Sequence, residues 1–258
     1  MQEKHLINQT IQKQVRHRTI REFKDEPIPK ELLDQLLEVA RRTATSTCMQ
    51  SSSIIRITDK ELKKEIADVC TQEYVARAPE LLIFIVDLRR NYQILKEKNG
   101  NLDNISGMDH FFASFTDACL MAQNVVNAAE SLDLGTVYLG SILNDPVIMC
   151  GLLKLPKLTF PVLGLAIGYP NQEPQIKPKM EMKYRVFENS YEIFDNYLEE
   201  LKDYDEEMQT YYDLRDTNRR VDCFSDQVVT RYSTAALKRQ EMLNVIRNQG
   251  FDLKVKNN

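Results

Sequence analysis

Six consecutive apolar residues, Leu81 to Val86, form the longest unbroken apolar run in the chain. The run is far shorter than the ~20 apolar residues that a helix needs to cross a bilayer. An apolar run of this length is typical of a strand that is buried on both faces. The chain is therefore expected to build a sheet that lies inside the protein.

Helical and strand patterns alternate around this run. Apolar residues at helical spacing predict a helix from Glu31 to Thr43, begun by Pro29, and Asp59 is predicted to cap a helix that runs to Val69. Further strands are expected at residues 53–58, 135–139 and 159–169, and a further helix at 147–153. This order of elements predicts an α+β core.

A long helix is predicted from Phe111 to Ser131, with apolar residues on most of its circumference. Such a helix is buried, either at the centre of a domain or against a second subunit. From Tyr191 the composition becomes charged and tyrosine-rich, with helix expected to Tyr212 and again from Asp226 to Asn248. We therefore expect two parts, an α+β core at residues 1–190 and a helical extension at 191–258.

Composition excludes several classes of protein. Hydrophobic residues at 43% and charged residues at 28% are ordinary for a globular chain of 258 residues, which argues against disorder and a membrane protein. The net charge of −4 argues against broad nucleic-acid binding, which requires a basic face. The first residues lack the pattern of a secretory signal, so a cytoplasmic location is expected.

Cysteine, histidine and glycine usage excludes three kinds of site. The five cysteines are odd in number and contain no C-x-x-C pair, so a disulfide framework is not expected. None of the three histidines has a metal-ligand spacing, so no metal is expected. The eight glycines form no G-x-G-x-x-G motif, so a nicotinamide cofactor would bind by a route other than a Rossmann fold.

The segment from His17 to Arg21 places three cationic side chains within five residues. Arg18 and Arg21 are three apart, so one helical turn would align both guanidinium groups on a single phosphate, with His17 and Thr19 as further donors. Taken alone, the segment is equally compatible with a solvated basic turn. A small anion is the ligand that the motif favours.

Further motifs are distributed along nearly the whole chain. In order they are Ala44-Thr45-Ser46-Thr47, Gln72 with Tyr74, Gly135-Thr136-Val137-Tyr138-Leu139-Gly140, Lys177-Pro178-Lys179, and Arg215 with Asn218-Arg219-Arg220. With the N-terminal H-R-x-x-R, this series resembles the oxygen-insensitive NADPH nitroreductases and the related NADPH:flavin reductases. The resemblance implies a nitroreductase fold with a central mixed sheet of four or five strands surrounded by helices. It also implies an intertwined, FMN-binding homodimer, with the helix from Phe111 to Ser131 helping to bury the interface.

The resemblance also assigns FMN contacts. The phosphate and ribityl end would be held by His17, Arg18, Thr19, Arg21, Lys177 and Lys179. The ring would be approached by Ser46, Gln72, Tyr74, Leu139, Gly140 and Ser141, with the backbone N–H of Gly140 near flavin N5. Without the resemblance, the two lysines would be interpreted as part of an exposed loop.

NADPH would be bound by Arg215, Arg219 and Arg220, for which the alternative is surface ion pairs with neighbouring aspartates. The implied reaction is ping-pong, with hydride passing from NADPH through flavin N5 to nitroaromatics, quinones, azo compounds or flavins. No catalytic side chain is required, because the flavin carries the chemistry. Two alternatives stay open: a dedicated reductase that supplies reduced flavin to a partner enzyme, and a non-catalytic flavin-binding protein.

Overall fold

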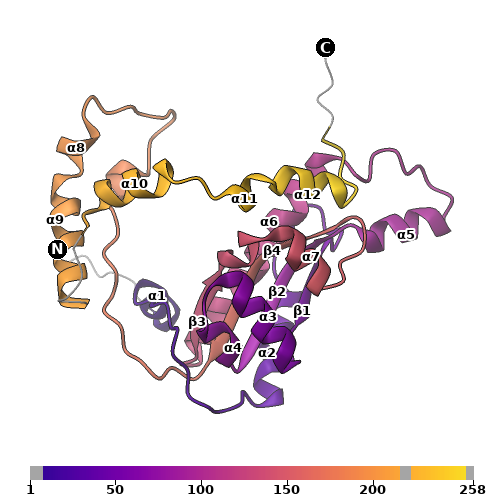
Figure 1. Ribbon diagram of the computed structural model, residues 1–258, viewed down its shortest axis with the longest axis horizontal. Coiled ribbons are helices and arrows are strands. Elements are labelled where there is room, and N and C mark those ends of the chain that lie inside the picture. The colour runs from indigo at the N-terminus through magenta and orange to yellow at the C-terminus, as the bar shows by residue number, and fades with distance from the viewer. Residues whose placement is uncertain (1–7, 216–221, 254–258) are drawn as a thin grey trace. The chain divides into compact units, whose positions relative to one another are not determined.

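The computed structural model of the protein describes residues 8–215 and 222–253 (Figure 1). The chain divides into two compact units, one of Met1–Glu173 with Ala236–Asn258 and the other of Pro174–Ala235. The first unit contains the sheet, and the second contains the helices η2, α8, α9 and α10. A functional division near residue 190 stays a prediction.

The sheet has four strands in the order β1-β2-β4-β3: β1 (Ser52–Arg56), β2 (Glu80–Asp87), β4 (Thr159–Gly168) and β3 (Gly135–Leu139). Each neighbouring pair is antiparallel, with Ile54 opposite Phe84 and Val137 opposite Ala166. The sequence analysis expected a sheet with both parallel and antiparallel pairs of strands. For these four strands that expectation is wrong, because all three pairs are antiparallel. Alternation of helices and strands along a sequence does not fix the direction in which a strand returns to the sheet. A parallel contact does occur at the β3 edge, as an isolated bridge between Thr19 and Thr136.

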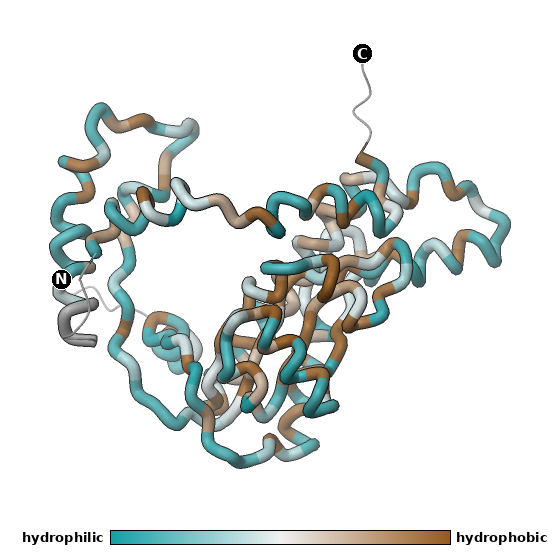
Figure 2. The backbone as a smooth tube through the Cα atoms, viewed as in Figure 1, coloured by the Kyte–Doolittle hydropathy of each residue, from teal (hydrophilic) through white to brown (hydrophobic). Residues whose placement is uncertain are grey.

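Strand β2 confirms the burial predicted from its sequence. Its residues from Leu81 to Val86 are all at most 5% exposed, so both faces of the sheet are covered. Helix α6 (Met108–Ser131) contacts all four strands, while α7 (Pro146–Leu152) packs on β4. Figure 2 shows the apolar residues gathered along the strands and the helices that cover them.

The helices predicted at residues 31–43, 59–69, 111–131 and 147–153 occur with small shifts of their ends, whereas the helix expected from Tyr191 to Tyr212 is wrong before Tyr197 and is broken into α8 and α9. The side chain of Asp59 caps α3 (Lys60–Cys70) by accepting the N–H of Leu62 at 2.7 Å, as expected. Among the described residues, no helix combines the length and the apolar character that crossing a membrane demands. The remaining helices are α1 (Gln9–Val15), α2 (Lys30–Arg41), α4 (Tyr74–Arg77), α5 (Arg89–Glu97), η1 (Gly140–Asn144), η2 (Met182–Tyr184), α8 (Tyr197–Glu200), α9 (Lys202–Arg215), α10 (Phe224–Ser233), α11 (Leu237–Gln240) and α12 (Met242–Asn248).

Helix α6 is buried along one side only. Phe111, Ala118 and Val125 are at most 3% exposed, whereas Phe112 and Leu120 are exposed by 62% and 47%. The apolar circumference that the sequence indicates is therefore partly covered within one chain. The exposed part is available to a second subunit.

The single helix expected from Asp226 to Asn248 is corrected to three, α10, α11 and α12. The chain becomes extended at Thr234, which has φ −105° and ψ 120°. Beyond the break, Lys238 donates to the carboxylate of Asp145, and Arg239 donates to the carbonyl oxygen of Gly140. These tertiary contacts outweigh the continuous helical pattern, because propensity alone is a weak determinant.

The segment before α2 lies along β3 and the end of β4. The N–H of Ile20 donates to the carbonyl oxygen of Thr136 at 2.9 Å, and Phe23 forms a bridge with Pro170. Gly135 is required for this packing, since a Cβ there would lie 2.7 Å from the Ile20 side chain. The sheet thereby fixes the residues on either side of Ile20.

Candidate functional site

The basic N-terminal motif is not helical. Helix α1 ends at Val15, and Thr19 takes part in a β-bridge, so the predicted helical alignment of Arg18 with Arg21 is wrong. Arg18 lines a cavity of about 610 Å³ with Arg16 and Glu130, whereas Arg21 lines another of about 650 Å³. The bridge of Thr19 to β3 favours extended backbone here, which separates the two guanidinium groups.

The Arg18 guanidinium is incompletely satisfied. Its Nη1 lies 3.7 Å from Oε1 of Glu173, and its Nε is buried without a hydrogen-bond partner among the described residues. A buried N–H of a charged group without an acceptor costs free energy. The guanidinium is therefore suited to donate a hydrogen bond to an oxygen atom of an anion.

His17 is held by an acidic neighbour. Its Nδ1 lies 2.7 Å from Oε1 of Glu130, and the same oxygen accepts the hydroxyl of Thr136 at 2.8 Å. In the described part of the chain the other ring nitrogen, Nε2, has no hydrogen-bond partner. The imidazole therefore has a fixed orientation and one nitrogen left for a ligand.

Gln72, Tyr74 and Ser141 form a second cluster, and Arg21 joins it. Oε1 of Gln72 accepts the Tyr74 hydroxyl at 3.0 Å and the Ser141 hydroxyl at 2.8 Å. Burial raises the pKa of Tyr74, and the nearby Arg21 guanidinium opposes that shift. The structure thus brings together four residues that the sequence analysis assigned to one ligand.

Gly140 begins η1 at the end of β3, directly after the fully buried Leu139. A Cβ at Gly140 would meet no atom within 4 Å, so packing within the protein does not require a glycine there. An open backbone position of this kind allows a flat ligand to approach closely. The observation fits the predicted contact with a flavin ring.

Ser46 lies in the loop after α2. Its backbone N–H donates to Oδ1 of Asp117 at 2.8 Å, and the residue is exposed. The backbone N–H of Ser46 is therefore occupied within the protein. The Ser46 hydroxyl has no hydrogen-bond partner among the described residues and stays available to a ligand.

The other predicted contacts belong to the second unit. Lys177 and Lys179 line a cavity of about 580 Å³ with Tyr204 and Phe224. Their approach to the Arg18 side chain stays a prediction. Arg215 ends α9, and its side chain, together with Arg219 and Arg220, lies outside the described residues.

Two family profiles match most of the chain. The profile of the Nitroreductase family matches residues 15–169, and that of the Nitroreductase family, C-terminal domain, matches residues 177–254. The chain belongs to the nitroreductase family. Its resemblance to this family, expected from the order of the motifs, is confirmed.

Relatives of this nitroreductase-family chain match it over most of its length. It is 36% identical to the oxygen-insensitive NADPH nitroreductase of Salmonella typhimurium, over 95% of this chain and 99% of the relative. It is 33% identical to the FMN reductase (NADPH) of Bacillus subtilis, over 86% and 91%. The structure of NfrA2 from B. megaterium superposes with a TM-score of 0.89 at 31% identity, covering 96% of this chain and 100% of that one. The nitroreductase fold is thereby confirmed.

Arg239 contacts Gly140, and the sequence analysis did not assign it to the site. Its Nη2 donates to the carbonyl oxygen of Gly140, and its Nε is buried without a hydrogen-bond partner among the described residues. The sequence analysis placed Arg239 within the helix expected from Asp226 to Asn248, where a pair of basic residues does not by itself indicate a site. The adjacent cations Lys238 and Arg239 are the one signal that the sequence offers.

Metal-ligating side chains do not gather in the described part of the chain. Within residues 8–215 and 222–253, no group of three or more histidine, cysteine or acidic residues could hold a metal ion. The five cysteines, Cys48, Cys70, Cys119, Cys150 and Cys223, are all free thiols.

Proposed function

We propose that this protein is an FMN-dependent oxidoreductase that uses NADPH to reduce nitroaromatics, quinones, azo compounds or free flavins by a ping-pong reaction. Family membership and relatives named as an NADPH nitroreductase and an NADPH-dependent FMN reductase support the proposal. The observation that carries it is the open Gly140 backbone beside the cluster of Gln72, Tyr74 and Ser141.

The residues present fit FMN. The buried, unsatisfied Nε of Arg18 suits a phosphate oxygen. Because Nδ1 of His17 donates to the Glu130 carboxylate, Nε2 of His17 donates to a phosphate only from the imidazolium form. Gln72 would donate its Nε2 to the polar edge of the ring, because its Oε1 is occupied by two hydroxyls. When bound, FMN supplies the acceptance and donation of hydride, and no side chain needs to act as nucleophile or general base.

NADPH is proposed to bind through Arg215, Arg219 and Arg220. A guanidinium contact with a phosphate is worth roughly 1.5–3 kcal/mol. Replacing Arg215 by alanine is therefore expected to raise KM for NADPH about tenfold or more while FMN stays bound. Steady-state kinetics with NADPH and NADH test this, and an unchanged KM removes Arg215 from the site.

A homodimer and a cytoplasmic location complete the proposal. The exposed Phe112 and Leu120 give α6 an apolar surface that a second copy would cover. The five free cysteines suit a reducing compartment. Small aromatic electron acceptors are the expected substrates.

The deciding experiment is the visible spectrum of the purified protein before and after NADPH, and separately NADH, in the absence of oxygen. An oxidised-flavin spectrum that NADPH bleaches is expected. A colourless protein that takes up no added FMN would overturn the proposal. A yellow protein that neither nucleotide bleaches would instead indicate a non-catalytic flavin-binding protein.

The two enzymatic alternatives differ in their acceptor. Turnover rates with a nitroaromatic, a quinone and free FMN, measured at equal concentrations, rank these acceptors and so distinguish the two alternatives. A strong preference for free FMN, together with rapid exchange of the bound flavin, would favour a dedicated flavin reductase.

A further inference from the structure

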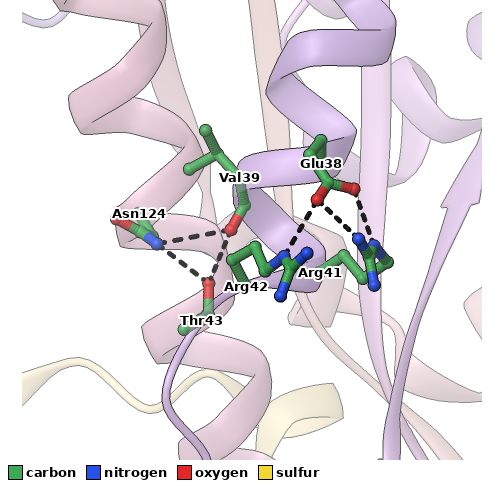
Figure 3. Close-up of polar contacts among 6 residues, drawn as sticks. All are labelled: Glu38, Val39, Arg41, Arg42, Thr43 and Asn124. Atoms are coloured by element: carbon green, nitrogen blue, oxygen red, sulfur yellow. Dashed lines mark hydrogen bonds and ion pairs between the residues drawn. The ribbon is translucent and has the colours of Figure 1, made fainter.

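The loop after α2 is fixed from one side of α6. Asn124 donates its Nδ2 to Oγ1 of Thr43 at 3.1 Å and to the carbonyl oxygen of Val39 at 3.4 Å, as Figure 3 shows. Two turns earlier on α6, Asp117 accepts the N–H of Ser46 at 2.8 Å. Residues two turns apart lie on the same side of a helix. One stripe of α6 therefore holds both the beginning and the middle of the loop.

The far end of the loop is also held by side chains. Asn91 donates its Nδ2 to the carbonyl oxygen of Met49 at 3.0 Å, and Arg90 donates to that of Gln50, both from α5. Cys48 and Gln50 have φ values of 58° and 54°, a left-handed conformation that non-glycine residues seldom adopt. The backbone of this loop is therefore determined by its neighbours rather than by its own propensity.

Asp117 is the most deeply buried of these anchors, at 2% exposure. A buried carboxylate is costly unless it is hydrogen-bonded, and a bond from a backbone N–H to a carboxylate is about twice as strong as a neutral one. Its bond turns the Ser46 N–H toward the protein interior. The hydroxyl is thereby the donor that Ser46 can still offer to a ligand.

We propose that Asp117 is a positioning residue for the flavin. Its carboxylate sets the loop so that the Ser46 hydroxyl meets FMN, and Asn124 supports the same loop at Thr43. The inference rests on the proposed function, because Ser46 contacts a flavin only if FMN is the ligand.

The test is FMN titration of the apoprotein, followed by flavin fluorescence, with circular dichroism to verify folding. Asp117→Ala is expected to weaken FMN binding by up to about tenfold, because the loop no longer holds the Ser46 hydroxyl against the flavin and one hydrogen bond is lost. Asp117→Asn retains an acceptor oxygen and is expected to stay within about threefold of wild type. Asp109→Ala, at the exposed start of the same helix, is the matched control and should bind FMN as wild type does.

A double-mutant cycle with Ser46→Ala separates positioning from general stability. Ser46→Ala keeps the backbone N–H and removes only the hydroxyl. If Asp117 acts through that hydroxyl, the effect of Asp117→Ala on FMN affinity should largely disappear in the Ser46→Ala background. Independent, multiplying effects of the two substitutions would overturn the inference.

The remaining outcomes are also decisive. A folded Asp117→Ala variant with wild-type FMN affinity overturns the positioning role while the proposed function stands. Wild-type apoprotein that binds no FMN overturns both. If Asp117→Ala does not fold, Asn124→Ala takes its place, with weakening of about threefold or more expected, and unchanged affinity there contradicts the inference.

Discussion

Ser141 donates its hydroxyl to Oε1 of Gln72 at 2.8 Å, and this contact determines which end of the Gln72 amide is free. Because the Tyr74 hydroxyl approaches the same oxygen, the Nε2 group is the one directed elsewhere. Two neutral hydrogen bonds thus orient a donor toward the proposed flavin ring.

Removing the Ser141 hydroxyl should therefore weaken flavin binding. Ser141→Ala deletes one bond worth about 0.5–1.5 kcal/mol, so the Kd for FMN is expected to rise by roughly two- to tenfold. Apoprotein titration measures the change. Ser131→Ala removes an exposed hydroxyl that bonds the Ala128 carbonyl, and serves as the control. Equal affinity of Ser141→Ala and wild type would show that the Gln72 amide does not depend on this contact.

Arg18 should control flavin occupancy. Its Nε is buried and has no hydrogen-bond partner among the described residues, so it can donate to a phosphate oxygen. Arg18→Ala is expected to yield colourless protein after purification, because a charge-assisted contact is lost. Arg41→Ala, which removes an exposed guanidinium paired with Glu38 on α2, should leave the protein yellow. The absorbance ratio of flavin to protein is the measurement, and full FMN occupancy in Arg18→Ala would exclude the phosphate role.

The sequence predicted those parts of the fold that local patterning determines. The apolar run from Leu81 to Val86 specified a buried strand, and Asp59 specified the start of α3, because both depend on neighbouring residues alone. The conformation of Arg18 could not be predicted in this way. Its segment has a helical spacing, but pairing of Thr19 with β3 holds it extended.

The candidate site shows the same division. The family resemblance assigned Gln72 and Gly140 to the flavin, and both assignments stay predictions, whereas the side chains that hold Ser46 and Gly140 in place were not foreseen. Asp117 and Arg239 act through contacts with Ser46 and Gly140, which are about 70 and 100 residues away in sequence. Long-range contacts of this kind leave no periodic signal in the chain.

The ion pair between Lys238 and Asp145 should stabilise the protein in a pH-dependent way. Nζ lies 2.6 Å from Oδ2, and this hydrogen bond holds the pKa of Asp145 below its ordinary value of 3.8. Since the pKa is lower in the folded protein, the stabilisation is present above the unfolded pKa and is lost as the pH falls through the folded pKa.

Lys238→Ala is accordingly expected to lower Tm by about 1–4 °C at pH 7, since one such pair contributes up to about 1 kcal/mol. The difference from wild type should shrink as the pH falls below the ordinary pKa of aspartate. Lys30→Ala, which breaks an exposed pair with Asp34, should shift Tm less. Thermal unfolding between pH 7 and a pH below the ordinary pKa of aspartate measures the Tm shifts of both variants. A Tm difference between Lys238→Ala and wild type that does not change with pH would contradict the role of this ion pair.

The exposed apolar side of α6 should mediate self-association. Phe112 and Leu120 are large, apolar and exposed on the same helix, and burying them would remove this surface from water. Phe112→Asp and Leu120→Asp are expected to convert a dimer into a monomer in light-scattering measurements. Leu243→Asp, at a residue exposed by 62% on α12, is the control. Unchanged mass for both α6 variants would place the interface elsewhere.

Arg239 should tune the reduction potential of the bound flavin. Its guanidinium lies against the carbonyl of Gly140, next to the surface that the ring is proposed to occupy. A cation there favours the negative charge that the flavin gains on reduction. Arg239→Ala is therefore expected to make the midpoint potential more negative by on the order of 30 mV, the equivalent of about 1.4 kcal/mol for a two-electron couple. Arg247→Ala, on α12 and bonded to Asn244, should leave the potential unchanged. If Arg239→Ala also leaves it unchanged while FMN stays bound, Arg239 serves only to dock α11 against η1.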